Sequence, residues 1–84
     1  MTKSTPCYAL DRWVTRIWQT DRRYCVGEVK QDLFGRWVLM KRWGSLYSRR
    51  GNSQTIVARD YNAATRLLED VAKQRQARHY RPVE

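Results

Sequence analysis

One amphipathic helical pattern near the C-terminus constrains the fold more than any other feature of this sequence. Asp60 fits the N-cap of a helix that Tyr61 opens and that runs to about Arg78. The chain is expected to leave the helix before Pro82, because the residue preceding a proline avoids the helical region. A single helix cannot bury its own apolar stripe, so the rest of the chain must supply an apolar surface. The stripe follows the i, i+3, i+4, i+7 spacing and consists of Ala64, Leu67, Leu68 and Val71.

Four segments ahead of this helix have the alternation and residue types of β-strands. They cover residues 8–19, 23–31, 36–43 and 53–58. Turns are expected at residues 20–22 and 32–35, and a basic loop over residues 44–52. This order predicts an α+β fold in two layers: an antiparallel sheet of four to five strands with one C-terminal amphipathic helix packed on one face. Residues 8–20 either add an edge strand or lie loose, and the sequence leaves this open.

The second strand-like segment, residues 23–31, separates two kinds of side chain. Cys25, Gly27 and Val29 fall on one side, and the opposite side carries side chains typical of an exposed face. Gly27 weakens its strand, or it allows a bulge or the close packing of a ring. The third segment, residues 36–43, has apolar groups on both faces, so we expect it to be central in the sheet.

The length of 84 residues allows a single domain over residues 1–84, of which residues 1–7 are expected to be flexible. Cys7 and Cys25 do not form a disulfide framework or a Cys-x-x-Cys pair, so we expect reduced thiols in a cytoplasmic protein. The N-terminus lacks the pattern of a signal peptide. Outside the helix the longest apolar run, residues 37–40, is far too short to span a membrane.

Positive charge and aromatic rings are concentrated in residues 35–51. From Leu33 through Arg59 there are six Lys or Arg and no Asp or Glu, in a chain with a formal net charge of +9. This surplus fits DNA, RNA or an anionic membrane surface as a partner, and it also fits a basic surface that serves solubility. Stacking rings combined with positive charge suit a nucleic-acid end or single strand, which favours DNA or RNA.

Candidate nucleic-acid-binding residues lie in this segment. Trp43 and Tyr47 can stack on a base or a sugar, each such contact contributing roughly 1–3 kcal/mol. Alternatively, Trp43 belongs to the core, as a tryptophan at an alternating strand position often does. The planar guanidinium group of arginine matches phosphate oxygens, so Arg42, Arg49 and Arg50 are candidates for phosphate contacts. Alternatively, these three arginines only form a solvated face.

A second basic cluster lies between Val71 and Val83, where there is no Asp or Glu. In one interpretation, this cluster extends the surface that contacts phosphates, or it binds an acidic protein. Complementarity to the helix dipole and solubility explain it as well. Its members are Lys73, Arg75, Arg78 and Arg81.

The sequence has no recognisable arrangement of residues for catalysis or for binding a metal. His79 is the only histidine, neither cysteine has a base nearby in sequence, and the carboxylates are scattered. Gly44 and Gly51 do not form a phosphate-cradling motif of the P-loop or dinucleotide kind. We therefore expect a protein that is not an enzyme and that uses no cofactor and no metal.

Several colinear stretches resemble the WGR domain, a small module found in poly(ADP-ribose) polymerases and in many short bacterial proteins. The resemblance covers about residues 22–83 and implies a sheet with one helix across a face and an affinity for DNA. In the polymerases the module grips a DNA break near its 5′ end, with the tryptophan of its name against the terminal sugar. The stretches that carry the resemblance are residues 32–37, Leu39, Trp43 and Gly44, residues 49–53, Ala64, Leu67, Leu68 and Tyr80.

The sequence departs from this family at two positions. Ser45 stands where the family has Arg, and Tyr47 stands where it usually has Gly. A ring at Tyr47 either occludes the sugar platform or adds a stacking face. The charge missing at Ser45 can be replaced by the nearby arginines. The catalytic domain of the polymerases has no counterpart here, so the resemblance implies no ADP-ribosyl transfer.

The sequence thus predicts a non-enzymatic nucleic-acid-binding module. DNA is expected to be bound through phosphate contacts without strong sequence specificity, with ends or nicks as candidate targets. The alternative is a protein–protein interaction adaptor that docks an acidic partner. The departures at Ser45 and Tyr47 favour the adaptor somewhat, because they remove a nucleic-acid contact and add surface typical of an interface. DNA versus RNA and the oligomeric state are left open.

Overall fold

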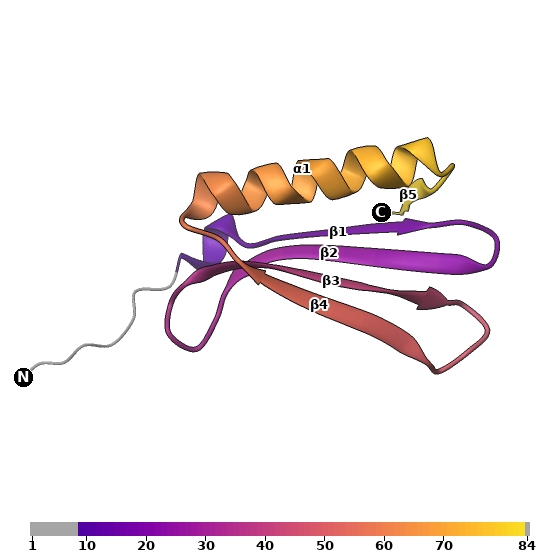
Figure 1. Ribbon diagram of the computed structural model, residues 1–84, viewed down its shortest axis with the longest axis horizontal. Helices are drawn as coiled ribbons and strands as arrows, with labels where there is room; N and C mark the ends of the chain where they lie inside the picture. Colours follow the sequence, from indigo (N-terminus) through magenta and orange to yellow (C-terminus); the bar gives the residue numbers. More distant parts are fainter. Residues whose placement is uncertain (1–8, 84) are drawn as a thin grey trace, which may run out of the picture.

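The computed structural model describes residues 9–83, and the elements follow one another along the chain as Figure 1 shows. Cys7, Tyr8 and the stretch 1–7 that is expected to be flexible lie outside the described residues. The elements are a 3₁₀ turn at Leu10–Arg12, β1 at Val14–Gln19, β2 at Arg23–Gln31, β3 at Trp37–Ser45, β4 at Gly51–Val57, α1 at Tyr61–Ala77 and β5 at Arg81–Val83.

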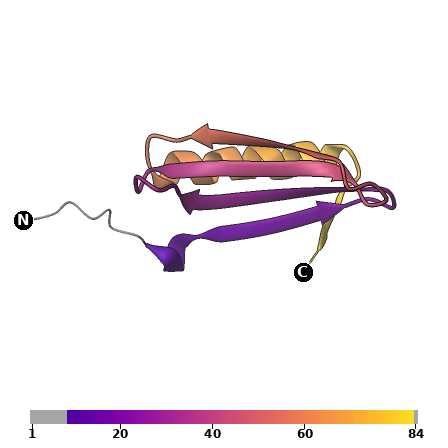
Figure 2. The same cartoon turned by 90° about the horizontal axis from the view of Figure 1, so that it is seen from below.

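The strands form one antiparallel sheet in the order β4-β3-β2-β1-β5, and α1 crosses one of its faces. Figure 2 looks onto the sheet from below, with the helix behind it. The predicted α+β architecture with a C-terminal helix is confirmed. For residues 8–20 neither alternative holds as stated: the strand begins only at Val14, after the 3₁₀ turn, and β1 is not an edge strand, because it lies between β2 and the short β5.

The core lies between the sheet and α1. Trp18, Cys25, Val29 and Leu39 point up from three adjacent strands, and the helix covers them with the predicted apolar stripe of Ala64, Leu68 and Val71. Partly buried Leu67 packs against the same cluster. The third predicted strand, β3, is an interior strand between β2 and β4, although the middle strand of the five is β2.

Gly27 permits the closest contact in this core. A Cβ atom at this position would lie 2.8 Å from Cδ1 of Leu68 and 3.2 Å from Cζ3 of Trp18. Of the three roles considered for Gly27, the structure shows the close packing of a ring. The glycine sits in mid-strand, where it pairs with Arg16 and Lys41.

The predicted basic loop over residues 44–52 is wrong at both ends, because β3 continues to Ser45 and β4 begins at Gly51. The ladder extends further because Gly44 and Gly51 pair directly and leave room for the Tyr24 ring. A Cβ atom at Gly51 would lie 2.8 Å from the Tyr24 hydroxyl oxygen. Trp43 and Gly44 are therefore strand residues, and the loop itself is limited to residues 46–50.

Both ends of α1 follow from local sequence. At the start, the Asp60 side chain accepts a hydrogen bond of 2.8 Å from the Ala63 amide, as an N-cap does. At the end, the amide of Tyr80 donates to the carbonyl of Arg75, and that of His79 donates to Gln76. These two bonds make a Schellman motif, which ends the helix at Ala77. Pro82 is therefore not the residue that terminates the helix. Pro82 lies in β5 instead.

Replacement of His79 by glycine is expected to stabilise the protein. His79 occupies the left-handed position of the Schellman motif with a φ of 67°, where a side chain is strained and glycine is not. We expect His79→Gly to raise the free energy of unfolding by about 0.5–1 kcal/mol in urea titrations. Ala77→Gly, two residues earlier in the helix, serves as the control and should instead cost about 1 kcal/mol. A loss of stability in His79→Gly would show that the His79 side chain has a stabilising role.

Candidate nucleic-acid interface

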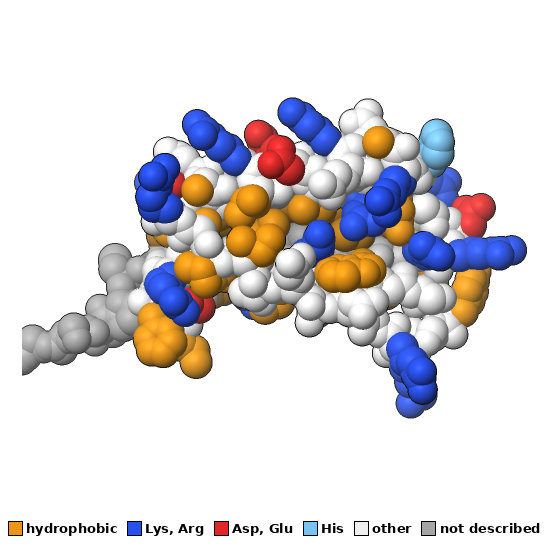
Figure 3. All heavy atoms as spheres, in the orientation of Figure 1, with side chains coloured by type: hydrophobic (Ala, Val, Ile, Leu, Met, Phe, Trp, Pro, Cys, Tyr) orange, Lys and Arg blue, Asp and Glu red, His pale blue; other side chains and the backbone are white. Residues whose placement is uncertain are grey.

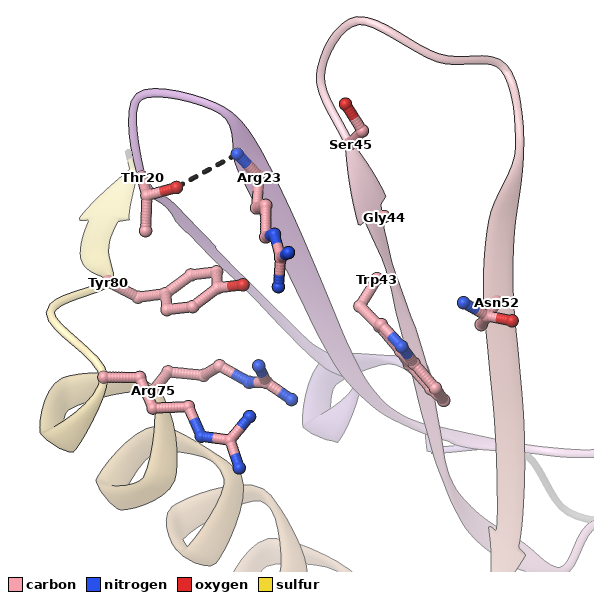
Figure 4. A pocket seen from close by; sticks show the side chains of 9 residues that line it. Thr20, Arg23, Trp43, Gly44, Ser45, Asn52, Arg75 and Tyr80 are labelled. Carbon is pink, nitrogen blue, oxygen red and sulfur yellow. Dashed lines mark hydrogen bonds between the residues drawn. The ribbon is translucent and has the colours of Figure 1, made fainter.

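A cavity of about 550 Å³ opens where the C-terminal end of α1 meets the sheet (Figure 4). Figure 4 shows Arg23, Tyr80 and Arg75 extending from β2 and from the helix end toward Trp43 on β3. We call it the Arg75 cavity. No Asp or Glu is among its lining residues, which are Thr20, Arg23, Trp43, Gly44, Ser45, Asn52, Arg75, Arg78 and Tyr80.

Arg75 is a buried charge without an anionic partner. Only 9% of the residue is exposed, and its Nε–H group has no hydrogen-bond partner. The ion pairs among residues 9–83 do not involve it. Its guanidinium carbon lies 5.1 Å from the centroid of the Tyr80 ring. A cation–π contact of this kind offsets only part of the cost of removing a charge from water.

The Schellman motif explains why these two side chains meet. It brings Tyr80 back toward Arg75, because the amide of Tyr80 is bonded to the carbonyl of Arg75. Arg75 in turn continues the apolar stripe of the helix, four residues after Val71, and so faces the sheet. The same local geometry that ends the helix therefore also builds one wall of the cavity.

Cys25 lies next to Arg75 in the core and is completely buried. Burial raises the pKa of the Cys25 thiol above its ordinary value, and the nearby charges of Arg75 and Lys41 offset only part of that rise. The thiol therefore stays protonated at neutral pH. A neutral, inaccessible thiol is a packing group and not a nucleophile.

The position of Trp43 is compatible with both roles considered for it. It is half-buried, packs against the core cluster and also lines the Arg75 cavity. The Lys41 amine lies 5.2 Å from its ring centroid, on the same face of β3. Trp43 can therefore present part of its ring to a ligand while the remainder is held by the core.

Six of the predicted binding residues are not among those that line this cavity, namely Arg42, Tyr47, Arg49, Arg50, Lys73 and Arg81. Arg42 points to the opposite face of the sheet, because neighbouring strand residues alternate, and its guanidinium lies 3.2 Å from Glu28. Lys73 is exposed on the helix. Arg81 is in β5 and pairs with Asp21 at 3.2 Å. Tyr47 is 81% exposed, and its hydroxyl donates to the carbonyl of Asp21.

Arg49 and Arg50 are exposed in the loop over residues 46–50, close in sequence to the strand ends that line the cavity. Within residues 9–83, neither guanidinium group takes part in an ion pair. The loop is shaped by its serines: the Ser45 hydroxyl accepts the Tyr47 amide, and the Ser48 hydroxyl accepts the Arg50 amide. Ser45 thus has a structural role in this chain, at the position where the resemblance implies an arginine.

Arg23 and Asn52 were missed as candidate residues, and Arg75 was only noted as part of a cluster. The alternation in β2 places Arg23 on the same face as Cys25, which is a signal that the sequence contained. The spacing of Ala64, Leu68 and Val71 likewise extends to position 75. Figure 3 shows Lys and Arg side chains over both ends of this face, several of them at the end where the helix ends.

No group of His, Cys, Asp and Glu within residues 9–83 is suited to hold a metal ion. The helices in the same range are too short or too polar to cross a membrane. Among families of known proteins, the model of the WGR domain matches residues 11–84, which is essentially the whole chain. No curated protein and no solved structure matches.

Proposed function

The chain belongs to the WGR domain family, a family of nucleic-acid-binding modules, and from this premise we propose that it binds DNA through the Arg75 cavity and the adjacent loop. The bound feature is a DNA end or nick, contacted without strong sequence specificity. The protein acts as a binding module and carries out no reaction itself. RNA shares the phosphate chemistry of DNA.

The observation that carries this proposal is the buried Arg75, which has no ion pair among the described residues and whose Nε–H group has no hydrogen-bond partner. Complementarity to the helix dipole accounts for an arginine on the surface near a helix end, but not for a buried one that lacks a counter-charge. A phosphate oxygen in the cavity would supply the missing acceptor and the missing negative charge. Arg23 and Arg78 line the same cavity and add charge around it.

The geometry supports binding to ends better than reading of a base sequence. The apolar face of α1 packs on the core, and its exposed face carries the acids Glu69 and Asp70 midway, which disfavours insertion of this helix into a DNA groove. Trp43 offers a ring edge beside the arginines, which suits the sugar or base at a strand terminus. Phosphate contacts then supply most of the affinity, and stacking orients the terminus.

The direct test is a chemical-shift titration with a blunt duplex, a nicked duplex and a closed circular duplex. Binding at the Arg75 cavity should shift the side-chain resonances of Trp43 and Arg75 with the first two ligands and more weakly with the circle. Equal shifts with all three ligands would contradict a preference for ends. Shifts confined to residues away from the cavity and the loop would contradict the site.

The loop arginines are expected to act by neutralising phosphates. The double variant Arg49→Ala/Arg50→Ala should weaken duplex binding and reduce the slope of log K against log salt by about two units, one for each phosphate that is no longer neutralised. Fluorescence anisotropy over a series of salt concentrations measures this slope. Arg59→Ala/Arg66→Ala, which removes two exposed charges outside the cavity and the loop, is the matched control. A slope that changes equally in both variants would show that only net charge matters.

A second candidate function, docking of a protein, rests on the opposite end of the molecule. Leu33 and Phe34 in the β2–β3 turn are 88% and 74% exposed, and Leu10 and Trp13 lie beside a shallow apolar cavity there. Exposed apolar groups of this kind are typical of interaction surfaces. Purification separates the two functions. A nucleic-acid binder should carry a high 260/280 absorbance ratio until it is washed with salt, whereas an adaptor should retain a defined polypeptide.

A further inference from the structure

We infer that the ligand of this protein is a DNA end with a single-stranded extension, and that the extension crosses Tyr80 into a second cationic cavity. This inference rests on the proposed function, because it takes the Arg75 cavity as the site of the first phosphate. The second cavity has a volume of about 330 Å³ and lies on the other side of Tyr80. We call it the Arg16 cavity after one of its lining residues.

The two cavities share one wall. Tyr80 lines both of them, with Arg75 on one side and Arg16 on the other. The helix separates them further, because Arg75 and Arg78 face the β3 side while Ala72 and Gln76 line the Arg16 cavity. A ligand that fills both must therefore pass around the end of α1, over the Tyr80 side chain.

Arg16 is placed to receive a phosphate. Its guanidinium carbon lies 5.4 Å from the centroid of the Trp18 ring, which holds the group in position without neutralising it. The ion pairs among the described residues do not include Arg16. Among the described residues, the short strand β5 pairs with residues 17–19 of β1, next to Arg16.

Arg81 strengthens the same cavity. It is paired with Asp21, but both side chains are largely exposed, so the pair is worth little and a phosphate can compete for the guanidinium. Gln76 adds an amide that can donate a hydrogen bond. As in the Arg75 cavity, no Asp or Glu from residues 9–83 lines the Arg16 cavity.

A flexible strand fits this arrangement better than a rigid duplex. Two phosphate sites on opposite flanks of one helix, with an aromatic ring between them, require a backbone that bends sharply and a base that stacks on the ring. Single strands have both properties, and stacking on aromatic side chains is how they are commonly bound. A stiff duplex can occupy the Arg75 cavity and the loop but does not reach around the helix end.

The experiment compares the dissociation constants of one duplex with a blunt end and with extensions of about four nucleotides, 5′ or 3′, by fluorescence anisotropy. For the unaltered protein we expect one of the two extensions to tighten binding about fivefold or more. Arg16→Gln should abolish this gain and leave the affinity for the blunt duplex unchanged. Arg66→Gln, an exposed helix arginine that lines neither cavity, should keep the gain.

The outcomes separate this inference from the proposed function. If the blunt duplex binds at the Arg75 cavity but neither extension helps, or if the gain persists in Arg16→Gln, the inference is overturned and the proposed function stands. If no duplex binds at all, both are overturned. Arg16 is exposed, so its variant is expected to melt at the same temperature as the unaltered protein, and a melting curve checks this.

Discussion

Replacement of Arg75 by methionine is expected to stabilise the free protein and to weaken its binding to DNA. Arg75 is buried, and its Nε–H group has no partner. Methionine has a similar length and no charge, so it can fill the same space without the cost of desolvation. We expect the free energy of unfolding to rise by about 1–3 kcal/mol.

The same substitution should cost at least about tenfold in affinity for a duplex end, because it removes a charged hydrogen bond to phosphate. A substitution that raises the free energy of unfolding but lowers the affinity for DNA indicates a residue whose role is to bind the ligand. Urea titration and fluorescence anisotropy on the same preparation measure the two effects. Arg66→Met removes one exposed charge from the same helix, and its stability should change by no more than about 0.5 kcal/mol.

A decrease in stability together with unchanged affinity would contradict this role of Arg75. It would mean that the guanidinium group is satisfied inside the protein and that the cavity is not the binding site. Thermal unfolding in the presence of DNA provides a second measurement. The ligand should raise the melting temperature of the unaltered protein in proportion to its affinity, and should have a much smaller effect on Arg75→Met.

Gly27→Val is expected to have the largest effect on folding. A Cβ atom at this position would already approach Leu68 to 2.8 Å and Trp18 to 3.2 Å, and valine adds two further carbon atoms. Trp18 is held in the core and cannot move aside, so the helix would have to lift from the sheet. We expect a loss of roughly 2–4 kcal/mol, a large part of the total stability of a domain of this size.

Urea unfolding followed by tryptophan fluorescence measures this loss. Ser53→Val places the same side chain on the edge strand β4, at an exposed position of the sheet, and should change stability by no more than about 0.5 kcal/mol. A midpoint for Gly27→Val that equals that of the unaltered protein would show that the helix can shift without loss. In that case the contact of Trp18 with Gly27 would not hold the two layers together.

Much of the fold could be predicted because its determinants are local. The stripe of Ala64, Leu68 and Val71 and the N-cap at Asp60 are properties of one short segment each, and both are confirmed. The bounds of β2 could be read from alternation and flanking turns in the same way. The loop over residues 44–52 was predicted too long, because glycines at 44 and 51 signal a turn unless they are known to face each other across a ladder.

The candidate site was harder to predict from sequence than the fold. Arg42 and Trp43 are adjacent in sequence, but alternation sends them to opposite faces of the sheet. The residues that do converge, Arg23, Trp43 and Arg75, come from two strands and the helix. Their positions along the chain do not indicate that they share a cavity, and no charge count distinguishes a buried arginine from an exposed one.

The order of the four longer strands and the helix, the apolar face of the helix and the positive charge of the whole chain could be read from the sequence, because these depend on neighbours within a few turns or one strand. The 3₁₀ turn and β5 could not, and neither could the grouping of the charges or the burial of Arg75. The register of β3 against β2 and the seating of the helix end over them set both outcomes. The cost of an unpaired charge arises from burial, and burial depends on packing between distant segments, which local patterns do not encode.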